Sequence, residues 1–203
     1  MCLLVGLSSL GLAQTINEIF DKTVPITWLG LDFTGAKFLG DREKYGSSSD
    51  VKFLIKSWND LIEREKDKYN VARATRKEKA EYHGDIAKAH NEDLDISDML
   101  SNAQTEYLHL KAEDITTIVN SYDFQGLSGI GLMFNIESFN KFEQQAAIWV
   151  TFINLNSKEI FFTDRILAPP GGAGMRNYWA RSILVAMEKM EKQMGVWKKK
   201  YVH

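Results

Sequence analysis

The chain has 203 residues, of which 44% are hydrophobic and 26% are charged, and its formal net charge is -2. This composition is that of an ordinary globular protein with enough apolar residues to form a core. Because the chain is almost neutral, it has no broad basic field. We therefore expect no nucleic-acid partner and no recruitment to an anionic membrane surface.

The first residues, MCLLVGLSSLGLA, predict an export signal over 1–13. The run is apolar and uncharged, and Gly11 and Ala13 place small residues at the positions that precede a cut after Ala13. It is too short to span a bilayer, and it lacks the usual basic opening, so the true start of the signal is expected further upstream. A buried helix or strand is the alternative.

Cys2 is the only cysteine, and it would leave with the signal. We therefore expect a mature chain without a disulfide, a thiolate metal site or a cysteine nucleophile. Residues 14–203 are predicted to form a single α+β domain. No later segment has the apolar length of a membrane span, so we expect no transmembrane span in the mature chain.

The first predicted element is a strand over Ile26–Phe33 that ends near Gly35. A helix follows, capped by Ser49 or Asp50, because VKFLIKSWNDLIEREKDK repeats apolar residues at helical spacing. The weak alternation around Val71 predicts an edge strand.

The segment near 73–111 is mostly polar, and the sequence leaves open whether it is ordered without a partner. Glu78–Ala89 has helix-forming residues but is polar on nearly every side, as is typical of a surface helix. Residues 90–98, HNEDLDISD, predict an acidic loop. Residues 111–124, KAEDITTIVNSYDF, predict an amphipathic helix with acidic residues in its first turn.

Three strands are predicted in the last third of the chain, over 129–139, 146–155 and 159–167. Short connections, including a hairpin turn around Asn156, imply an antiparallel meander. A helix with a methionine-rich buried stripe follows from about Arg176 to Met194, with Gly195 as its C-cap glycine. These elements predict an α+β fold with a mainly antiparallel sheet, a C-terminal three-stranded meander, and helices packed on one face.

The stretch LAPPGGAGMRNYWARSI contains the candidate ligand-binding or partner-binding residues, which are Gly172, Gly174, Arg176, Asn177 and Tyr178. A glycine-rich loop that enters a helix can present free N–H groups to an anion. Arginine, asparagine and tyrosine offer planar donors and an aromatic face for a partner. The loop lacks the Gly-Lys-Ser/Thr ending of a Walker loop and the context of a dinucleotide fingerprint.

The alternative interpretation of this stretch is a strand-to-helix turn whose glycines adopt positive φ. In that case Arg176 would be buried in a salt bridge with Asp164 or Glu137, and Trp179 would be fully packed. A binding role would instead leave Arg176 exposed and unpaired beside a pocket.

No metal site and no catalytic residue are assigned. The acidic residues over 85–98, with His83 and His90 nearby, lack the ligand spacing of a calcium loop or a zinc helix. There is no Gly-x-Ser-x-Gly motif. Asp32 and carboxylates of the meander could do acid–base work, but ion pairs on a sheet surface are the commoner outcome. We predict no cofactor and favour a protein that is not an enzyme.

The order of elements from Ile26 to Met194 resembles the α+β envelope domain of the curli-secretion and TolB N-terminal type. The phrases GLMFNIESFNK, WVTFINLNSKEIFFTDRI and GMRNYWA resemble more closely those of uncharacterised exported proteins of Bacteroidetes-type bacteria. This resemblance implies an envelope location and leaves the biochemical role open. The chain has nothing like the membrane-inserting hairpins of the curli pore, which argues against a pore.

We therefore predict a periplasmic or otherwise exported, non-catalytic cell-envelope protein that acts through protein–protein contacts. Its partner would be an envelope protein or a second copy of itself. The aromatic-rich meander and the last helix would offer a sheet edge or a helix face for assembly. The alternative is a small-ligand (anion) binding protein or a hydrolase that uses the Gly171–Arg176 loop.

Overall fold

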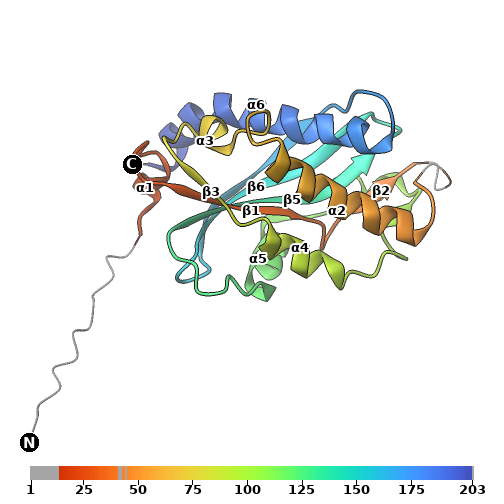
Figure 1. Cartoon of the computed structure of the whole chain (residues 1–203), viewed down its shortest axis with the longest axis horizontal. Coiled ribbons are helices and arrows are strands. Elements are labelled where there is room, and N and C mark those ends of the chain that lie inside the picture. Colours follow the sequence, from red (N-terminus) through yellow and green to blue (C-terminus); the bar gives the residue numbers. More distant parts are fainter. Residues whose placement is uncertain (1–13, 41–42, 44, 203) are drawn as a thin grey trace, which may run out of the picture.

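The computed structural model describes residues 14–40, 43 and 45–202, so the predicted export signal at 1–13 lies outside the described residues. Within this part, the chain forms one sheet of seven strands with helices on both faces (Figure 1). The strands are β1 (Ile26–Asp32), β2 (Lys37–Leu39), β3 (Ala80–Tyr82), β4 (Leu100–Ser101), β5 (Ile130–Asn140), β6 (Gln145–Asn154) and β7 (Ile160–Ala168). The helices are α1 (Ile16–Ile19), α2 (Ser48–Arg64), α3 (Val71–Ala74), α4 (Asp85–Glu92), α5 (Ala112–Ser121) and α6 (Met175–Tyr201), with a 3-10 turn, η2 (Gln104–Glu106).

The long strand β5 lies at the centre of the sheet. Along one of its sides run β1 and then β2, both parallel to it. The short strands β3 and β4 pair in parallel with the outer sides of β1 and β2. On the other side of β5, β6 and then β7 add as antiparallel neighbours. The sheet is therefore parallel in one half and an antiparallel meander in the other.

The predicted fold class is wrong, because five of the strands are parallel and the fold is α/β rather than α+β with a mainly antiparallel sheet. The three strands β2, β3 and β4 have only three, three and two residues, which is too short to show an alternating pattern. Parallel neighbours need crossover connections, which the chain makes through α2 and α3 and then through α4 and α5. The meander of β5, β6 and β7 is present as predicted.

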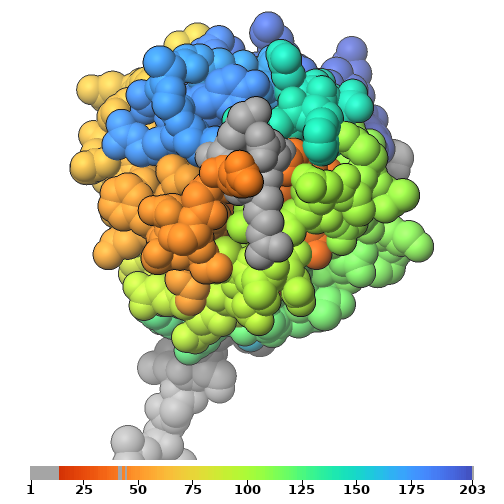
Figure 2. Space-filling view, turned by 90° about the vertical axis from the view of Figure 1, so that its right-hand side faces the viewer, coloured from red at the N-terminus to blue at the C-terminus, as the bar shows by residue number. Residues whose placement is uncertain are grey.

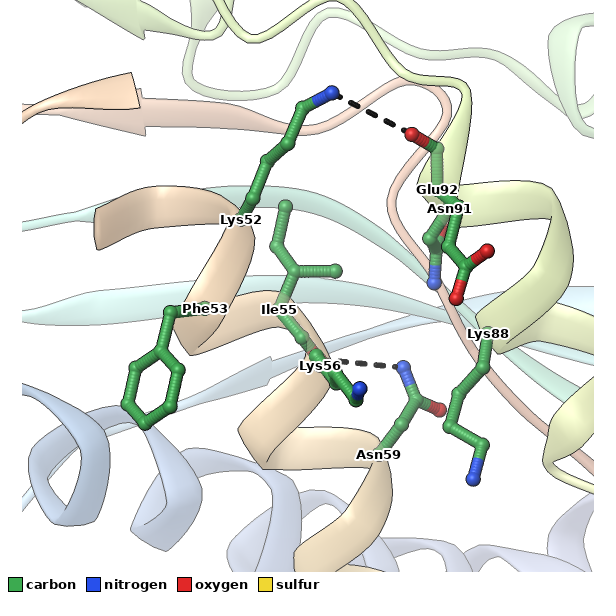
Figure 3. Close-up of a pocket in the computed structure, with 8 residues that line it drawn as sticks. All are labelled: Lys52, Phe53, Ile55, Lys56, Asn59, Lys88, Asn91 and Glu92. Carbon is green, nitrogen blue, oxygen red and sulfur yellow. Dashed lines mark hydrogen bonds between the residues drawn. The ribbon is translucent and has the colours of Figure 1, made fainter. Parts of the chain in front are cut away.

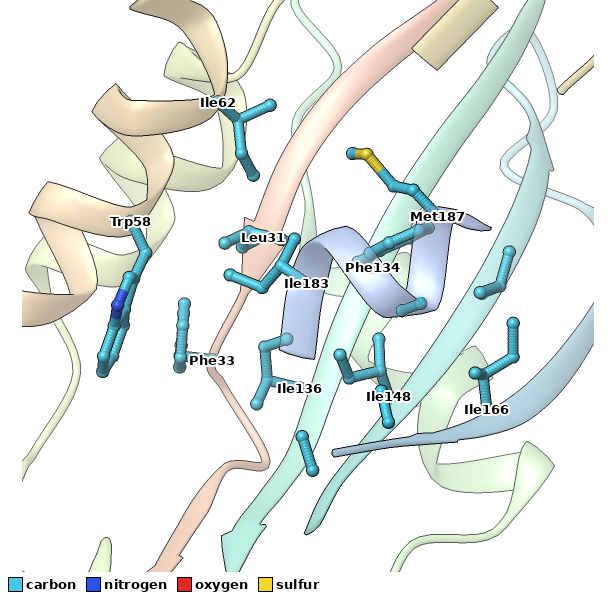
Figure 4. Packing of buried hydrophobic residues seen from close by; sticks show 14 of the residues in the cluster. Leu31, Phe33, Trp58, Ile62, Phe134, Ile136, Ile148, Ile166, Ile183 and Met187 are labelled. Carbon is cyan, nitrogen blue, oxygen red and sulfur yellow. The ribbon is translucent and has the colours of Figure 1, made fainter. Parts of the chain in front are cut away.

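Helices cover both faces of the sheet, not one face as predicted: α2, α3 and α6 lie on one side and α4 and α5 on the other (Figure 1). The larger core cluster packs Trp58 of α2 and Ile183 of α6 against strand residues such as Phe134 (Figure 4). The second cluster packs Leu29 of β1 against Ile115 of α5 and its neighbours. Because side chains alternate along a strand, β1 and β5 supply both cores and are buried throughout.

Two segments in the polar middle differ from the prediction. The segment around Val71 is the short helix α3, whose start is capped by Asn70 through a hydrogen bond from the Arg73 N–H to Asn70 Oδ1 at 2.8 Å. Glu78–Ala89 is not one helix but contains β3 and the start of α4. Both errors have the same cause, because tertiary packing decides the structure of short polar segments whose own propensities are weak.

The last helix is longer than predicted. It continues to Tyr201, so Gly195 is an internal residue and not a C-cap. The extension is stabilised by aromatic packing, because Trp197 packs at a tilt against Phe162 of β7 and Tyr201 stacks on it, with ring centroids 5.4 and 4.4 Å away. The predicted buried stripe of α6 is confirmed, because Met187, Met190 and Met194 are buried against the sheet.

The helix α2 is present as predicted, but its N-cap is Ser47. The Asp50 N–H donates to Ser47 Oγ at 3.3 Å, and the Ser47 N–H donates to Asp50 Oδ2 at 2.8 Å, which forms a capping box. No helix among the described residues has the length and apolar character needed to cross a bilayer.

Candidate functional site

The glycine-rich loop connects β7 to α6 and has the geometry of a strand-to-helix turn. Gly172 and Gly174 have φ values of +97° and +78°, a region that residues with a side chain rarely adopt. Gly174 is the N-cap residue of α6, and its carbonyl accepts a hydrogen bond from the Tyr178 N–H at 2.9 Å. The Gly171 N–H then donates to the Tyr178 carbonyl at 3.0 Å, which closes the loop on the helix.

Arg176 is exposed and forms neither of the predicted salt bridges. Its guanidinium group donates only to Asn177 Oδ1, at 3.3 and 3.1 Å, and no acidic residue in the described part of the chain pairs with it. Glu137 instead pairs with Arg165 at 2.7 Å, and Asp164 accepts from Trp197 Nε1 at 2.7 Å. Arg176 therefore meets the condition set for a binding role.

Trp179 meets the condition set for a structural role. It is fully buried and stacks on Phe139 with ring centroids 4.6 Å apart. Tyr178 is half-buried and lines a different hollow, together with Lys141, Gly172 and Gly174. The five candidate residues therefore do not face one ligand, since Arg176 and Asn177 line one groove and Tyr178 another.

The groove that contains Arg176 and Asn177 lies between α2 and α6 and has a volume of about 620 Å³. Three cations line it, and two of them are paired: Lys68 with Glu65 at 3.2 Å, and Arg181 with Glu188 at 3.3 Å. Figure 2 views the end of the molecule where the α6 start, in blue, lies beside the first turns of α2, in orange. The groove thus presents Arg176 as its unpaired positive charge.

A second cleft, which the sequence did not indicate, lies between α2 and α4 and has a volume of about 400 Å³ (Figure 3). Lys52, Lys56 and Lys88 line it, beside the exposed ring of Phe53. Lys88 pairs with Asp60 at 3.1 Å and with Glu63 at 3.8 Å, whereas Lys52 donates to the Glu92 carbonyl at 3.4 Å. A cleft at the carboxyl end of parallel strands is a frequent ligand site, and Lys52 and Lys56 have no carboxylate partner among the described residues.

The carboxylates considered for acid–base work are already hydrogen-bonded. Asp32 is fully buried and accepts from the Tyr122 hydroxyl at 2.7 Å and from Asn135 Nδ2 at 3.0 Å. Burial, with Asp32 beside it, raises the pKa of Tyr122 well above its usual value. Glu137 accepts from Trp149 Nε1 at 3.0 Å as well as pairing with Arg165. These contacts make both carboxylates part of the sheet rather than open reactive groups.

The two histidines considered as metal ligands contact different groups. The ring of His90 stacks on Tyr122 with centroids 4.1 Å apart, and the His83 N–H donates to the Trp28 carbonyl at 2.8 Å. Over residues 14–40, 43 and 45–202, no group of three or more His, Cys, Asp or Glu side chains is placed to hold a metal ion.

The outer strand β7 is the feature of the meander that is open to a partner. Asn154 donates to the Glu159 carbonyl and accepts from the Lys158 N–H, both at 2.8 Å, so its backbone groups point toward β7. The N–H and C=O groups of successive residues in β6 point alternately toward β5 and toward β7. The β6 residues paired with Phe162, Asp164, Ile166 and Ala168 therefore also direct these groups toward β7. The intervening residues of β7 must therefore direct their N–H and C=O groups away from the sheet.

These outward residues are Thr163, Arg165 and Leu167. The contact of Leu167 agrees with this assignment, because its carbonyl accepts from Lys189 Nζ of α6 at 2.6 Å rather than from β6. The Arg165 N–H donates to its neighbour Asp164 Oδ1 at 3.1 Å. No strand in the described part of the chain pairs with this edge, which is nine residues long.

Neither a scan against protein-family models nor a search of curated proteins finds a match for this chain. Among solved structures, a hypothetical protein from Chlamydia trachomatis is similar, with 10% identity and a TM-score of 0.35, over 89% of this chain and 98% of that one. The C-terminal domain of LpoB from Salmonella enterica is also similar, with 10% identity and a TM-score of 0.27, over 73% of this chain and 84% of that domain. These scores are too low to assign a function, and the resemblance to exported Bacteroidetes-type proteins stays a prediction.

Proposed function

We propose that this protein is an exported, non-catalytic binding protein of the cell envelope that holds a partner polypeptide at the open edge of β7. The observation that carries the proposal is the edge itself, where Thr163, Arg165 and Leu167 turn their backbone groups outward. An extended segment can add to such an edge as a further strand and gain main-chain hydrogen bonds. The export signal predicted over residues 1–13 supports the envelope location.

Binding accounts for the polar residues of the sheet better than catalysis does. Asp32 and Glu137 each accept hydrogen bonds from at least two donors within the protein, as is typical of carboxylates with a structural role. The edge of β7, by contrast, lies beside exposed side chains of α6 and is within reach of another chain.

The test is photo-crosslinking from the edge in the cell. A photo-reactive residue replaces Gln193, which is exposed and lines the groove between β7 and α6. The matched control carries the same residue at Lys56, which is exposed on α2. We expect one recurrent partner at position 193, absent from position 56 and lost when Leu167→Pro removes an outward N–H. Equal capture at both positions, or capture that survives Leu167→Pro, would contradict the proposal.

A second candidate function, anion binding in the groove between α2 and α6, is favoured by the exposed and unpaired guanidinium group of Arg176. Calorimetric titration with inorganic phosphate tests it. Heat of binding that disappears in Arg176→Ala, while the melting temperature is unchanged, would support this function. Binding that is equal in the wild type and the variant would rule out Arg176 as its ligand.

A further inference from the structure

The groove beside the open edge of β7 is positively charged. It has a volume of about 360 Å³ and is lined by Arg165 and Leu167 of β7 and by Lys189, Lys192 and Gln193 of α6, and none of the described residues that line it is acidic. Arg165 is neutralised by Glu137, with which it pairs at 2.7 Å. The two lysines have no carboxylate partner among the described residues and give this groove its positive charge. The Asp164 carboxylate lies further back along the same edge, where it accepts from Trp197 Nε1 and the Arg165 N–H.

These lysines belong to a row that follows the strand. The helix α6 runs back along β7, so Lys189 contacts Leu167 near the end of the strand, while Trp197 contacts Asp164 further back. Lys200 is near the same strand, because its Nζ lies 4.7 Å from the centroid of the Tyr201 ring, which stacks on Phe162 of β7. Cations of α6 therefore accompany the edge over several residues.

One face of an added strand would lie against this row of α6 lysines. Side chains alternate along a strand, so every second residue of the incoming segment would lie on the same side as α6. Acidic residues at those positions would place carboxylates beside Lys189 and Lys192 while the backbone pairs with Thr163 and Leu167. The Lys189 ammonium group could then exchange the Leu167 carbonyl for a carboxylate and leave that carbonyl to an incoming N–H.

We infer that the segment which adds to β7 is an extended, acidic peptide with carboxylates at every second position. The inference rests on the proposed function and names the chemical class of its partner. A second copy of this chain is a poor occupant, because a symmetric pairing of two β7 edges would bring the α6 lysines of both copies to the same junction.

The experiment uses three synthetic peptides that match the nine residues of β7 in length. The first alternates threonine with glutamate, the second alternates threonine with lysine, and the third keeps the glutamates but has prolines that prevent strand pairing. Binding to the protein is measured by fluorescence anisotropy at low and high salt. Hydrogen exchange of the Thr163 and Leu167 amides is measured with and without peptide.

We expect only the first peptide to bind, more weakly at high salt, and to slow exchange at Thr163 and Leu167. Lys192→Glu should weaken binding by about tenfold, whereas the matched Lys56→Glu on α2 should not. Binding by the lysine peptide, binding by the proline peptide, no binding by the first peptide, or unchanged exchange at the two amides would each overturn the inference.

The two proposals fail in different ways. If crosslinking at position 193 captures a partner that Leu167→Pro abolishes, but the acidic peptide does not bind, the edge is a binding site and the acidic class is wrong. If neither occurs, the proposed function fails too. Sedimentation that shows a dimer of the full chain, lost in Leu167→Pro, would assign the edge to a second copy and overturn the acidic peptide.

Discussion

Two buried asparagines from different helices bond the backbone at the end of β1. Replacing both should lower the free energy of unfolding by more than the sum of the two single losses. Asn59 of α2 accepts from the Leu31 N–H at 2.8 Å and donates to the Leu31 carbonyl at 3.1 Å. Asn91 of α4 donates to the same carbonyl at 2.8 Å and accepts from the Phe33 N–H at 2.9 Å. The neighbouring strand β3 pairs only with Ile26–Trp28, so these amides replace the missing strand.

The size of the effect follows from the groups left without partners. Asn59→Ala leaves the buried Leu31 N–H without an acceptor, and Asn91→Ala does the same to the Phe33 N–H, at a cost of about 1–3 kcal/mol each. In each single variant the Leu31 carbonyl keeps one donor. In the double variant it loses both donors, so the loss should exceed the sum of the single losses by about 1 kcal/mol.

Urea unfolding, followed by tryptophan fluorescence, measures the free energy of unfolding of each variant. Asn120→Ala is the matched control, because Asn120 is exposed on α5 and its change should be within about 0.5 kcal/mol. Single variants that cost no more than this control would refute the role of the amides. A double variant whose loss equals the sum would show that the Leu31 carbonyl does not depend on them.

Three further predictions concern single residues. Arg176→Ala should shift the melting temperature by less than about 2 °C, because the side chain is exposed and bonded only to its neighbour; a marked drop would restore the structural interpretation. Gly30→Ala should cost more than about 2 kcal/mol in a urea titration, because φ is +108° and a Cβ would lie 2.8 Å from Ala87 Cβ; an unchanged midpoint would contradict this packing. Burial lowers the pKa of Lys77 to about 8, from 10.5. The unfolded chain therefore binds more protons between these values, and the unfolding free energy should rise by roughly 3 kcal/mol across this range relative to Lys77→Met; a parallel course of both proteins would refute it.

The meander could be predicted because its signals are local. The runs of β5, β6 and β7 are nine to eleven residues long, and the connections between them are short, so neighbouring strands must pair antiparallel. The parallel half could not be predicted from comparable signals. The strand β4, for example, has only two residues, and its pairing with Phe38 and Leu39 of β2 spans a long stretch of chain.

The candidate site could be predicted only in part. The glycines and the helix start identified the turn into α6, including the positive φ at Gly172 and Gly174. The pairing of Arg176 could not be predicted, because Glu137 pairs with Arg165 of β7 and Asp164 accepts from Trp197 of α6. The buried roles of Asn59 and Asn91 were missed for a related reason, since an asparagine on a helix gives no sign that it faces a strand end.

The two edges of the sheet differ in length and in how their backbone groups are bonded, and this difference bears on the proposed function. On the parallel side the edge strands are the very short β3 and β4, which pair with β1 and β2, and the amides of Asn59 and Asn91 bond the backbone of Leu31 and Phe33 beyond β3. On the other side, β7 presents nine residues, and within the described part of the chain Asp164 and Lys189 are the side chains that bond its outward groups. Long open edges invite unwanted pairing, so proteins usually shorten or cover them. The proposed pairing at β7 needs a long edge of this kind, and under that proposal the lysines of α6 would restrict which strands can add there.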